Sequence, residues 1–382
     1  MKILHCADLH LNSAFSGLDV AEADKRRAEM QETLAEVIKY ASESEVALIL
    51  IAGDLFDTPY CSARARAEIF QILGGASCPV VISPGNHDHY TRGGVYADSS
   101  LPENVFVFTS MEMGRFDFDD IGITVCGYAY TSDKYERDPL CEGAPVSEEN
   151  VNILCAHTDV RYAVSLHAPM TAGEIARNGF TYAALGHVHN PSAPQRIGNC
   201  TVAYSGFLQG RGFDEPGDGG VYIVDVDREK KSVSLERKTF SRLRYVIERL
   251  DISGCGKDTE VISAIMKLVS DRGYGKNTAL RVILDGAVAS EYTPSKRKIC
   301  SSGALSGLAL IEIKDESVST VGLEGLAEDV TIRGEFYRAL LPSLESADPD
   351  ERQRAKLALS LGLAALDKRE IALGHAEGEG DS

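Results

Sequence analysis

The sequence predicts an α/β protein: a β-sandwich of mixed sheets flanked by helices, followed by a small α+β domain. Apolar runs of strand length alternate with amphipathic helical segments over roughly the first hundred residues. Short strands then follow one another, and the pattern changes again near residue 240. These three observations, in a chain of 382 residues, indicate one large domain and one smaller domain.

The first three predicted strands are separated by helices. Residues 2–6, 46–52 and 79–83 are the strands, and the last two are continuous apolar runs typical of strands that are buried on both faces. Residues 20–44 and 62–73 have the spacing of amphipathic helices. This order predicts parallel strands that are joined by right-handed crossovers.

The next predicted strands are shorter and mostly lack helices between them. They fall at residues 104–109, 116–118, 123–127, 151–156, 182–185, 201–204 and 220–226. Thr171 and Glu174 form a capping-box pattern, which predicts that a helix begins there. We therefore expect mixed sheets with helices outside them.

The C-terminal third has a different pattern. Residues 245–252, 258–271 and 278–284 predict a strand, a helix and a strand. A further helix is expected from Pro349, with Asp348 as its N-cap, and its apolar stripe is typical either of core packing or of partner docking. The predicted division is a large domain at 1–240, a capping domain at 241–345, a C-terminal helix at 346–373 and a disordered tail at 374–382.

Composition indicates the general class of protein. Hydrophobic residues make up 44% and charged residues 25% of the chain, and no apolar run reaches the ~20 residues that a membrane span needs. The N-terminus is typical of a first strand rather than of a signal peptide. Nine dispersed cysteines without a CxxC pair predict free thiols. We expect a cytoplasmic protein without membrane association.

The charge pattern bears on possible substrates. A net charge of −18 disfavours a non-specific nucleic-acid binder, which is usually basic. Residues 228–244 are an exception, with seven Lys or Arg residues against two Glu. This strip is either the solvated face of a hairpin or a phosphate-contacting surface, and Lys230 and Lys231 are its candidate substrate-binding residues.

Five short motifs rich in Asp, His and Asn each follow a predicted strand. They are Asp8-Leu9-His10, Gly53-Asp54-Leu55-Phe56-Asp57, Gly85-Asn86-His87-Asp88, His157, and Gly186-His187-Val188-His189. Because ligands bind beyond the carboxyl ends of strands in such sheets, these side chains should converge. Five of the nine His residues lie in the motifs, and the other four (His5, His89, His167 and His375) are expected to be structural.

The residue types in these motifs indicate a metal centre. Carboxylate, imidazole and amide donors without Cys suit manganese, iron or zinc. Seven such positions are more than one ion requires, so two ions that share a carboxylate are expected. Two-metal sites clamp the attacking and leaving oxygens of phosphoryl transfer, which predicts a phosphoesterase.

The motif series D-x-H, GDxxD, GNH[DE], H and GHxH resembles that of the calcineurin-like metallophosphoesterase superfamily over residues 1 to about 225. The flanking segments HCADLHLNSAFSGL and QGRGFDEPGDGG are similar to those of bacterial DNA repair exonucleases of the SbcD and YhaO type. This resemblance implies a manganese-dependent DNA exo- or endonuclease with a C-terminal capping domain.

The resemblance also implies roles for individual residues. The first metal would be held by Asp8, His10 and His189, the second by Asn86, His157 and His187, and Asp54 would bridge the two. A bridging hydroxide would be the nucleophile, and His87 would stabilise the transition state and act as general acid. Asp57 resembles the carboxylate that orients this His in phosphatases, although recombination nucleases of archaea and eukaryotes carry His there. Arg211 is a further substrate-binding candidate.

Partners and rival functions follow from the same resemblance. It implies DNA as substrate, an SMC-like ATPase of the SbcC type as partner, and a homodimer. One rival is a phosphodiesterase or pyrophosphatase that acts on a small nucleotide, which the acidic net charge favours. The other is a non-catalytic scaffold, which is disfavoured because all seven ligand positions and His87 are present.

Overall fold

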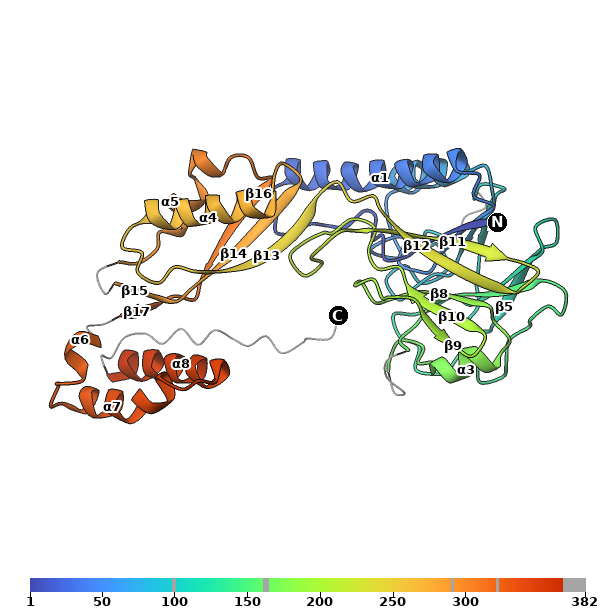
Figure 1. The fold of residues 1–382 in the computed structure, drawn as a ribbon. Coiled ribbons are helices and arrows are strands. Elements are labelled where there is room, and N and C mark those ends of the chain that lie inside the picture. The colour runs from blue at the N-terminus through green and yellow to red at the C-terminus, as the bar shows by residue number, and fades with distance from the viewer. Residues whose placement is uncertain (98–100, 161–164, 290–291, 321–322, 367–382) are drawn as a thin grey trace. The chain divides into compact units, whose positions relative to one another are not determined.

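A computed structural model describes residues 1–97, 101–160, 165–289, 292–320 and 323–366. The chain divides into two compact units, Met1–Val246 and Ile247–Ser382, which are treated separately below (Figure 1). The finer division predicted from the sequence stays a prediction, and the predicted tail at 374–382 lies outside the described residues.

The first unit contains two six-stranded sheets, and the first of these has the order β12-β11-β1-β2-β3-β4. Its strands are β1 (Lys2–Cys6), β2 (Leu48–Ile51), β3 (Val80–Ile82), β4 (Val105–Val107), β11 (Gly220–Asp227) and β12 (Ser232–Thr239). Strands β1 to β4 are parallel, while β11 runs antiparallel to both β1 and β12. The predicted mixed sheet is thus confirmed.

The second sheet has the order β5-β6-β7-β8-β10-β9. Its strands are β5 (Gly114–Phe118), β6 (Ile123–Gly127), β7 (Val151–His157), β8 (Tyr182–Gly186), β9 (Gln195–Ile197) and β10 (Cys200–Tyr204). The four central strands are parallel, and the edge strands β5 and β9 are antiparallel to their neighbours.

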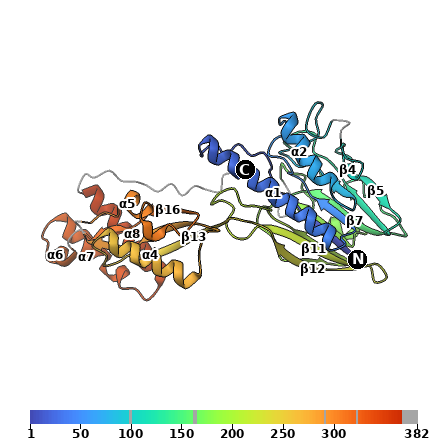
Figure 2. The same cartoon turned by 90° about the horizontal axis from the view of Figure 1, so that it is seen from above.

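The two sheets pack face to face, with helices on the outer faces (Figures 1 and 2). Helices α1 (Val20–Glu43) and α2 (Ala63–Gly74) cover the first sheet, and α3 (Ala172–Arg177) lies against the second. Successive side chains of a strand point to opposite faces. In β2, Ile49 and Ile51 therefore pack toward α1, whereas Leu48 and Leu50 pack toward the second sheet. This double burial explains the continuous apolar run.

Two helix starts are capped by side chains, and the cap at Thr171 was predicted from the sequence. The Ser62 side chain accepts a hydrogen bond from the Ala65 backbone N–H at the start of α2. Thr171 and Glu174 form both hydrogen bonds of a capping box at α3. These contacts satisfy backbone donors that the first helical turn leaves without partners.

The second unit contains a three-stranded sheet, a short strand pair and several helices. Its sheet has the order β13-β14-β16, with strands β13 (Arg244–Asp251), which begins in the first unit, β14 (Thr278–Asp285) and β16 (Leu310–Asp315). The other elements are α4 (Asp258–Arg272), β15 (Ala287–Ala289), α5 (Lys296–Cys300), η1 (Gly303–Leu305), β17 (Val318–Thr320), α6 (Leu323–Leu326), α7 (Ile332–Leu344) and α8 (Pro349–Leu366). Leu326, Leu359 and Leu363 form a small core with side chains of α7.

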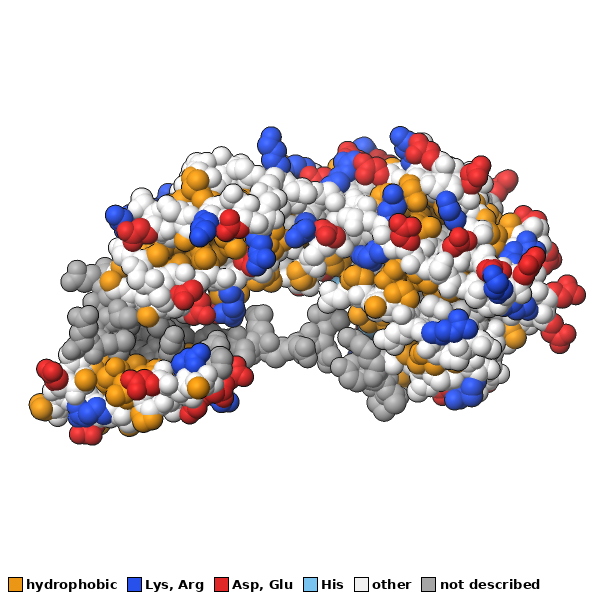
Figure 3. Space-filling view, in the orientation of Figure 1, with side chains coloured by type: hydrophobic (Ala, Val, Ile, Leu, Met, Phe, Trp, Pro, Cys, Tyr) orange, Lys and Arg blue, Asp and Glu red, His pale blue; other side chains and the backbone are white. Residues whose placement is uncertain are grey.

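Surface charge and hydrophobicity are consistent with the composition. Figure 3 shows basic and acidic side chains interspersed over the face that it draws. Within the described residues, none of the helices is long and apolar enough to cross a membrane.

Candidate metal centre

The loops that follow β1 and β2 lie side by side and hold four predicted site residues. The backbone N–H of Asp8 donates to Gly53 O over 3.1 Å, and that of His10 donates to Asp54 O over 2.9 Å. Asp8, His10 and Asp54 have positive φ angles of 52°, 45° and 49°. Residues other than glycine adopt this conformation rarely, although Asp and His tolerate it better than most, and such residues cluster at functional sites. The strained turns aim these side chains at one point beyond the strand ends.

Asp8, His10 and His189 form the first group of candidate ligands. One donor atom from each lies within 4.8 Å of the others. The Nε2 atoms of His10 and His189 are 3.2 Å apart, so the two imidazoles face a common position. The loop after β1 contributes Asp8 and His10, and the loop after β8 contributes His189.

Asp54 and His157 form the centre of a second group. Asp54 Oδ2 lies 3.3 Å from His157 Nε2 and 3.7 Å from His10 Nε2, so the Asp54 carboxylate is placed between the two groups. His157 Nε2 is also 2.9 Å from Asn86 Oδ1. The His187 ring packs edge-on against His157, with centroids 5.2 Å apart. The structure thus brings together all seven residues that were predicted as ligands.

Both carboxylates are buried and fit a cation. Asp8 and Asp54 are 2% and 1% exposed. Each accepts one backbone N–H through its Oδ1 atom, from His187 and His87 respectively, over 3.0 Å. Asp8 Oδ2 is buried and accepts no hydrogen bond from the described residues. A buried carboxylate oxygen without a donor is costly unless a cation meets it, so this donor set fits divalent metal ions.

The charged groups influence one another strongly. Burial raises the pKa of Asp54 and the adjacent His157 lowers it, and the net shift is downward. Burial lowers the pKa of His157, but Asp54 and Asp8 raise it to about 9. Burial and the neighbouring His157 lower the pKa of His187 to about 2. In the metal-free protein the His157 ring is therefore protonated on both nitrogens at neutral pH. A bound ion would displace one of these protons, because metals bind neutral imidazole.

His87 is partly exposed and lies beside this cluster. Its Nδ1 is 3.2 Å from the backbone oxygen of Asp57, which fixes Nδ1 as the protonated donor. Its ring meets the His10 ring edge-on at a centroid distance of 4.7 Å. A donor atom of His87 also lies within 4.8 Å of atoms of His10 and Asp54, so His87 is close to the candidate ligands.

The structure corrects the role predicted for Asp57. Its carboxylate was expected to orient His87, but Oδ1 lies 3.1 Å from His10 Nδ1 and 2.9 Å from Arg211 Nη1. His87 is instead bound by the backbone oxygen of Asp57. The reason is the joining of the two loops by the Asp57 N–H bond to Leu11 O, which places the carboxylate beside the His10 ring.

Arg211 is held by carboxylates rather than left available for substrate. Its Nε and Nη2 donate to Glu215 Oε1 over 3.0 and 2.6 Å, and its backbone N–H donates to Oε2 over 2.8 Å. Glu215 Oε1 also lies 2.9 Å from His189 Nδ1. Burial raises the pKa of Glu215, but His189 and Arg211 lower it to about 2. The structure thus places Arg211 against groups that contact candidate ligands, and its substrate-binding role stays a prediction.

Lys230 and Lys231 are not part of this site. They lie in the turn between β11 and β12, and β11 runs antiparallel to β1 with Asp225 opposite Lys2. The turn is therefore at the amino end of β1, about 20 Å along the strand from the cluster at its carboxyl end. Lys230 Nζ is 2.8 Å from Asp227 Oδ2, and Lys231 Nζ donates to Glu148 O. The two lysines are therefore remote from the candidate ligands, and phosphate contact by the strip stays a prediction.

Two contributors to the site were missed in the sequence. Glu215 lies within the quoted QGRGFDE segment, and only its contact with His189 shows its role. Asp88 of the GNHD motif is fully buried and accepts hydrogen bonds from the backbone of Phe56 and Gly85. The contacts of Glu215 with His189 and of Asp88 with Phe56 join separate loops, so no spacing rule signals them. His167, which was expected to be structural, has its ring centroid 4.5 Å from that of His187.

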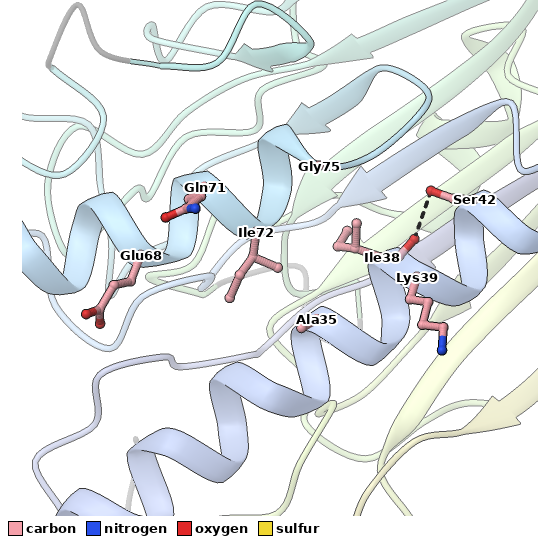
Figure 4. A pocket seen from close by; sticks show the side chains of 8 residues that line it. All are labelled: Ala35, Ile38, Lys39, Ser42, Glu68, Gln71, Ile72 and Gly75. Atoms are coloured by element: carbon pink, nitrogen blue, oxygen red, sulfur yellow. Dashed lines mark hydrogen bonds between the residues drawn. The ribbon is translucent and has the colours of Figure 1, made fainter.

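A shallow groove elsewhere on the first unit does not belong to the centre (Figure 4). It is lined by Ala35 and Lys39 of α1 and by Gln71 and Ile72 of α2, among others. These residues lie near the C-terminal ends of the two helices, which lead into the amino ends of β2 and β3. The groove is therefore at the opposite end of the parallel strands from the cluster.

Comparisons with known proteins bear on the family of the chain. A family model described as calcineurin-like phosphoesterase matches residues 1–191, a range that includes all seven candidate ligands. The chain is 26% identical over 302 residues to a Bacillus subtilis protein named uncharacterized metallophosphoesterase YhaO, covering 75% of this chain and 72% of that protein.

Solved structures that are similar to the chain include two phosphatases. A dimetal phosphatase from Danio rerio has a TM-score of 0.41 at 11% identity, with 63% of this chain and 96% of that chain covered. Purple acid phosphatase PPD1 from yellow lupin (Lupinus luteus) has a TM-score of 0.41 at 12% identity, with 63% and 51% covered.

Proposed function

The chain belongs to the calcineurin-like phosphoesterase family, and on that premise we propose that it is a two-metal phosphodiesterase that cleaves DNA. The observation that carries the metal-dependent chemistry is the convergence of the five motif loops around the buried carboxylates of Asp8 and Asp54. Manganese is the proposed ion, and iron and zinc also suit these donors.

The proposed metal ligands are the seven converging residues. Asp8, His10 and His189 would hold one ion, Asn86, His157 and His187 the other, and Asp54 would contact both. When bound, two such ions neutralise charge on the phosphoryl oxygens and lower the pKa of a water molecule.

His87 is the proposed general acid. The Asp57 backbone oxygen accepts its Nδ1–H, so the Nε2 atom of the protonated ring is the one that can donate to the leaving oxygen. The His87 backbone N–H donates to Asp54 Oδ1 over 3.0 Å, which ties the acid to the candidate ligands. The ring is thereby oriented before substrate arrives.

DNA as substrate is supported by sequence resemblance. The segments around Asp8 and Arg211 are similar to those of bacterial DNA repair exonucleases. An SMC-like ATPase partner and a homodimer belong to the same proposal. One observation favours a small nucleotide ester instead, namely the net charge of −18, which disfavours approach of a polyanion.

Hydrolysis assays with Mn²⁺ test these proposals. Linear DNA, bis-p-nitrophenyl phosphate and cyclic nucleotides would be compared for the wild-type chain and for His87→Ala, with bound metal measured in both. We expect DNA cleavage that falls by about 10²–10⁴-fold in the variant while two ions stay bound. Cleavage of the small esters alone would refute DNA as substrate, and loss of an ion in His87→Ala would show that His87 is a ligand.

A further inference from the structure

Two carboxylates, joined by an arginine, contact the Nδ1 atoms of the two imidazoles in the first ligand group. Asp57, Arg211 and Glu215 are here called the carboxylate bracket. Asp57 contacts His10 Nδ1 at 3.1 Å, and Glu215 contacts His189 Nδ1 at 2.9 Å. Arg211 lies between the two carboxylates, with Nη1 2.9 Å from Asp57 and Nη2 2.6 Å from Glu215.

The bracket fixes the proton and the orientation of each ring. A carboxylate at Nδ1 holds the proton on that nitrogen, so the Nε2 lone pair is available for a metal. The two Nε2 atoms are 3.2 Å apart and face one position. Arg211 is separated by 154 positions from Asp57 in the sequence, so its guanidinium locks together loops that the chain alone does not connect.

The second ligand group has a different kind of support. His157 Nδ1 is 3.0 Å from the backbone oxygen of Ala52, and its other close ligand neighbour, Asn86, is neutral. Asp54 lies near both groups, and Asp8 Oδ1 also lies 4.0 Å from His157 Nδ1, so neither carboxylate distinguishes them. The first group, in contrast, has the two bracket carboxylates against one guanidinium, which leaves one net negative charge.

We propose that the carboxylate bracket is a set of positioning residues that makes the Asp8–His10–His189 site bind a divalent ion more tightly than the site around His157. The two ions then load in order, the first site before the second. This inference rests on the proposed two-metal centre and adds a difference in metal affinity between its two sites. The physical reasons are the greater local negative charge and the greater basicity of imidazoles that donate to carboxylates.

Titration of the metal-free, full-length chain with Mn²⁺ in a calorimeter tests the proposal. The wild-type chain should show two classes of site. Glu215→Gln should weaken the tighter class by about 10–100-fold and leave the weaker class within about 3-fold. Asn86→Ala should remove the weaker class and keep the tighter one, which assigns the classes to the sites.

Glu43→Gln is the matched control. It removes the same charge from an exposed pair with Lys39 at the end of α1, where the two groups are 3.7 Å apart. Asp57→Asn is the second test variant, because Asp57 is partly exposed whereas Glu215 is buried. It should likewise weaken only the tighter class, which a general loss of stability would not do.

The outcomes separate the two proposals. A wild-type chain that binds no Mn²⁺ would overturn the metal centre and this inference together. Two ions in the wild-type chain, with Glu215→Gln and Asp57→Asn equal to the control, would overturn only the bracket. A single class of equivalent sites, or weakening confined to the class that Asn86→Ala removes, would also refute the proposed order.

Discussion

Replacing Gly186 by alanine should disturb the metal centre through the backbone. Gly186 ends β8, where the two sheets meet. A Cβ atom there would lie 1.9 Å from the Ala52 carbonyl oxygen and 2.8 Å from Ala7 Cβ. Real Cβ atoms stay at least 3.0 Å from such neighbours, so the Ala52 carbonyl must move by about 1 Å, the difference between the two values.

This displacement would affect both stability and metal binding. Overpacking of this kind costs about 1–3 kcal/mol, and we expect the upper end because the neighbour is backbone rather than a flexible side chain. The Ala52 oxygen that must move also accepts the hydrogen bond from His157 Nδ1. Loss of such an orienting partner typically weakens metal binding 10–100-fold.

Urea unfolding of the metal-free protein and Mn²⁺ titration measure the two effects. Gly17→Ala is the control, because nothing lies within 4 Å of the Cβ position at Gly17. A Gly186→Ala protein within about 0.5 kcal/mol of this control, with the same Mn²⁺ affinity, would refute the reasoning.

The remaining predictions concern single groups. Asp54→Ala should lose both ions, because Asp54 lies between the two ligand groups, and elemental analysis that finds two ions would contradict its shared role. Burial lowers the pKa of His5 from 6.5 to about 3; below pH 6.5 the unfolded chain therefore binds a proton that the folded chain does not. The free energy of unfolding should accordingly fall, relative to His5→Gln, by about 1.4 kcal/mol per pH unit from pH 6.5 toward pH 3. If the free energies from urea unfolding change with pH in parallel for the two proteins, His5 is not the cause. Replacing Lys230 and Lys231 together by alanine should leave hydrolysis of bis-p-nitrophenyl phosphate within about 2-fold, since these residues lie at the far end of the sheet; a tenfold loss would place them near the substrate.

The predictions from sequence succeeded where the physical signal is local. The apolar run that contains β2, the capping box at Thr171 and the order of the motif loops all depend on neighbouring residues or on a fixed spacing. Strand ends in a parallel sheet meet at one edge, so the approach of Asp8 to Asp54, which follow the neighbouring strands β1 and β2, could be anticipated.

The partners of charged side chains were predicted less well. Asp57 was matched to His87 by motif analogy, and the structure places its carboxylate on His10 and Arg211. Lys230 and Lys231 appeared as part of a basic strip, and the antiparallel pairing of β11 with β1 places them far from the centre.

The mixed α/β fold class and the residues that gather at one edge of the sheets could be predicted from the amino-acid sequence, because strand periodicity and motif order are local features of the chain. The three-dimensional arrangement was needed to show which carboxylate supports which imidazole, and that Glu215 belongs to the site. The reason is that a contact such as that of Glu215 with His189 forms between separate loops, whose approach depends on how the two sheets pack and not on the spacing of residues within either loop.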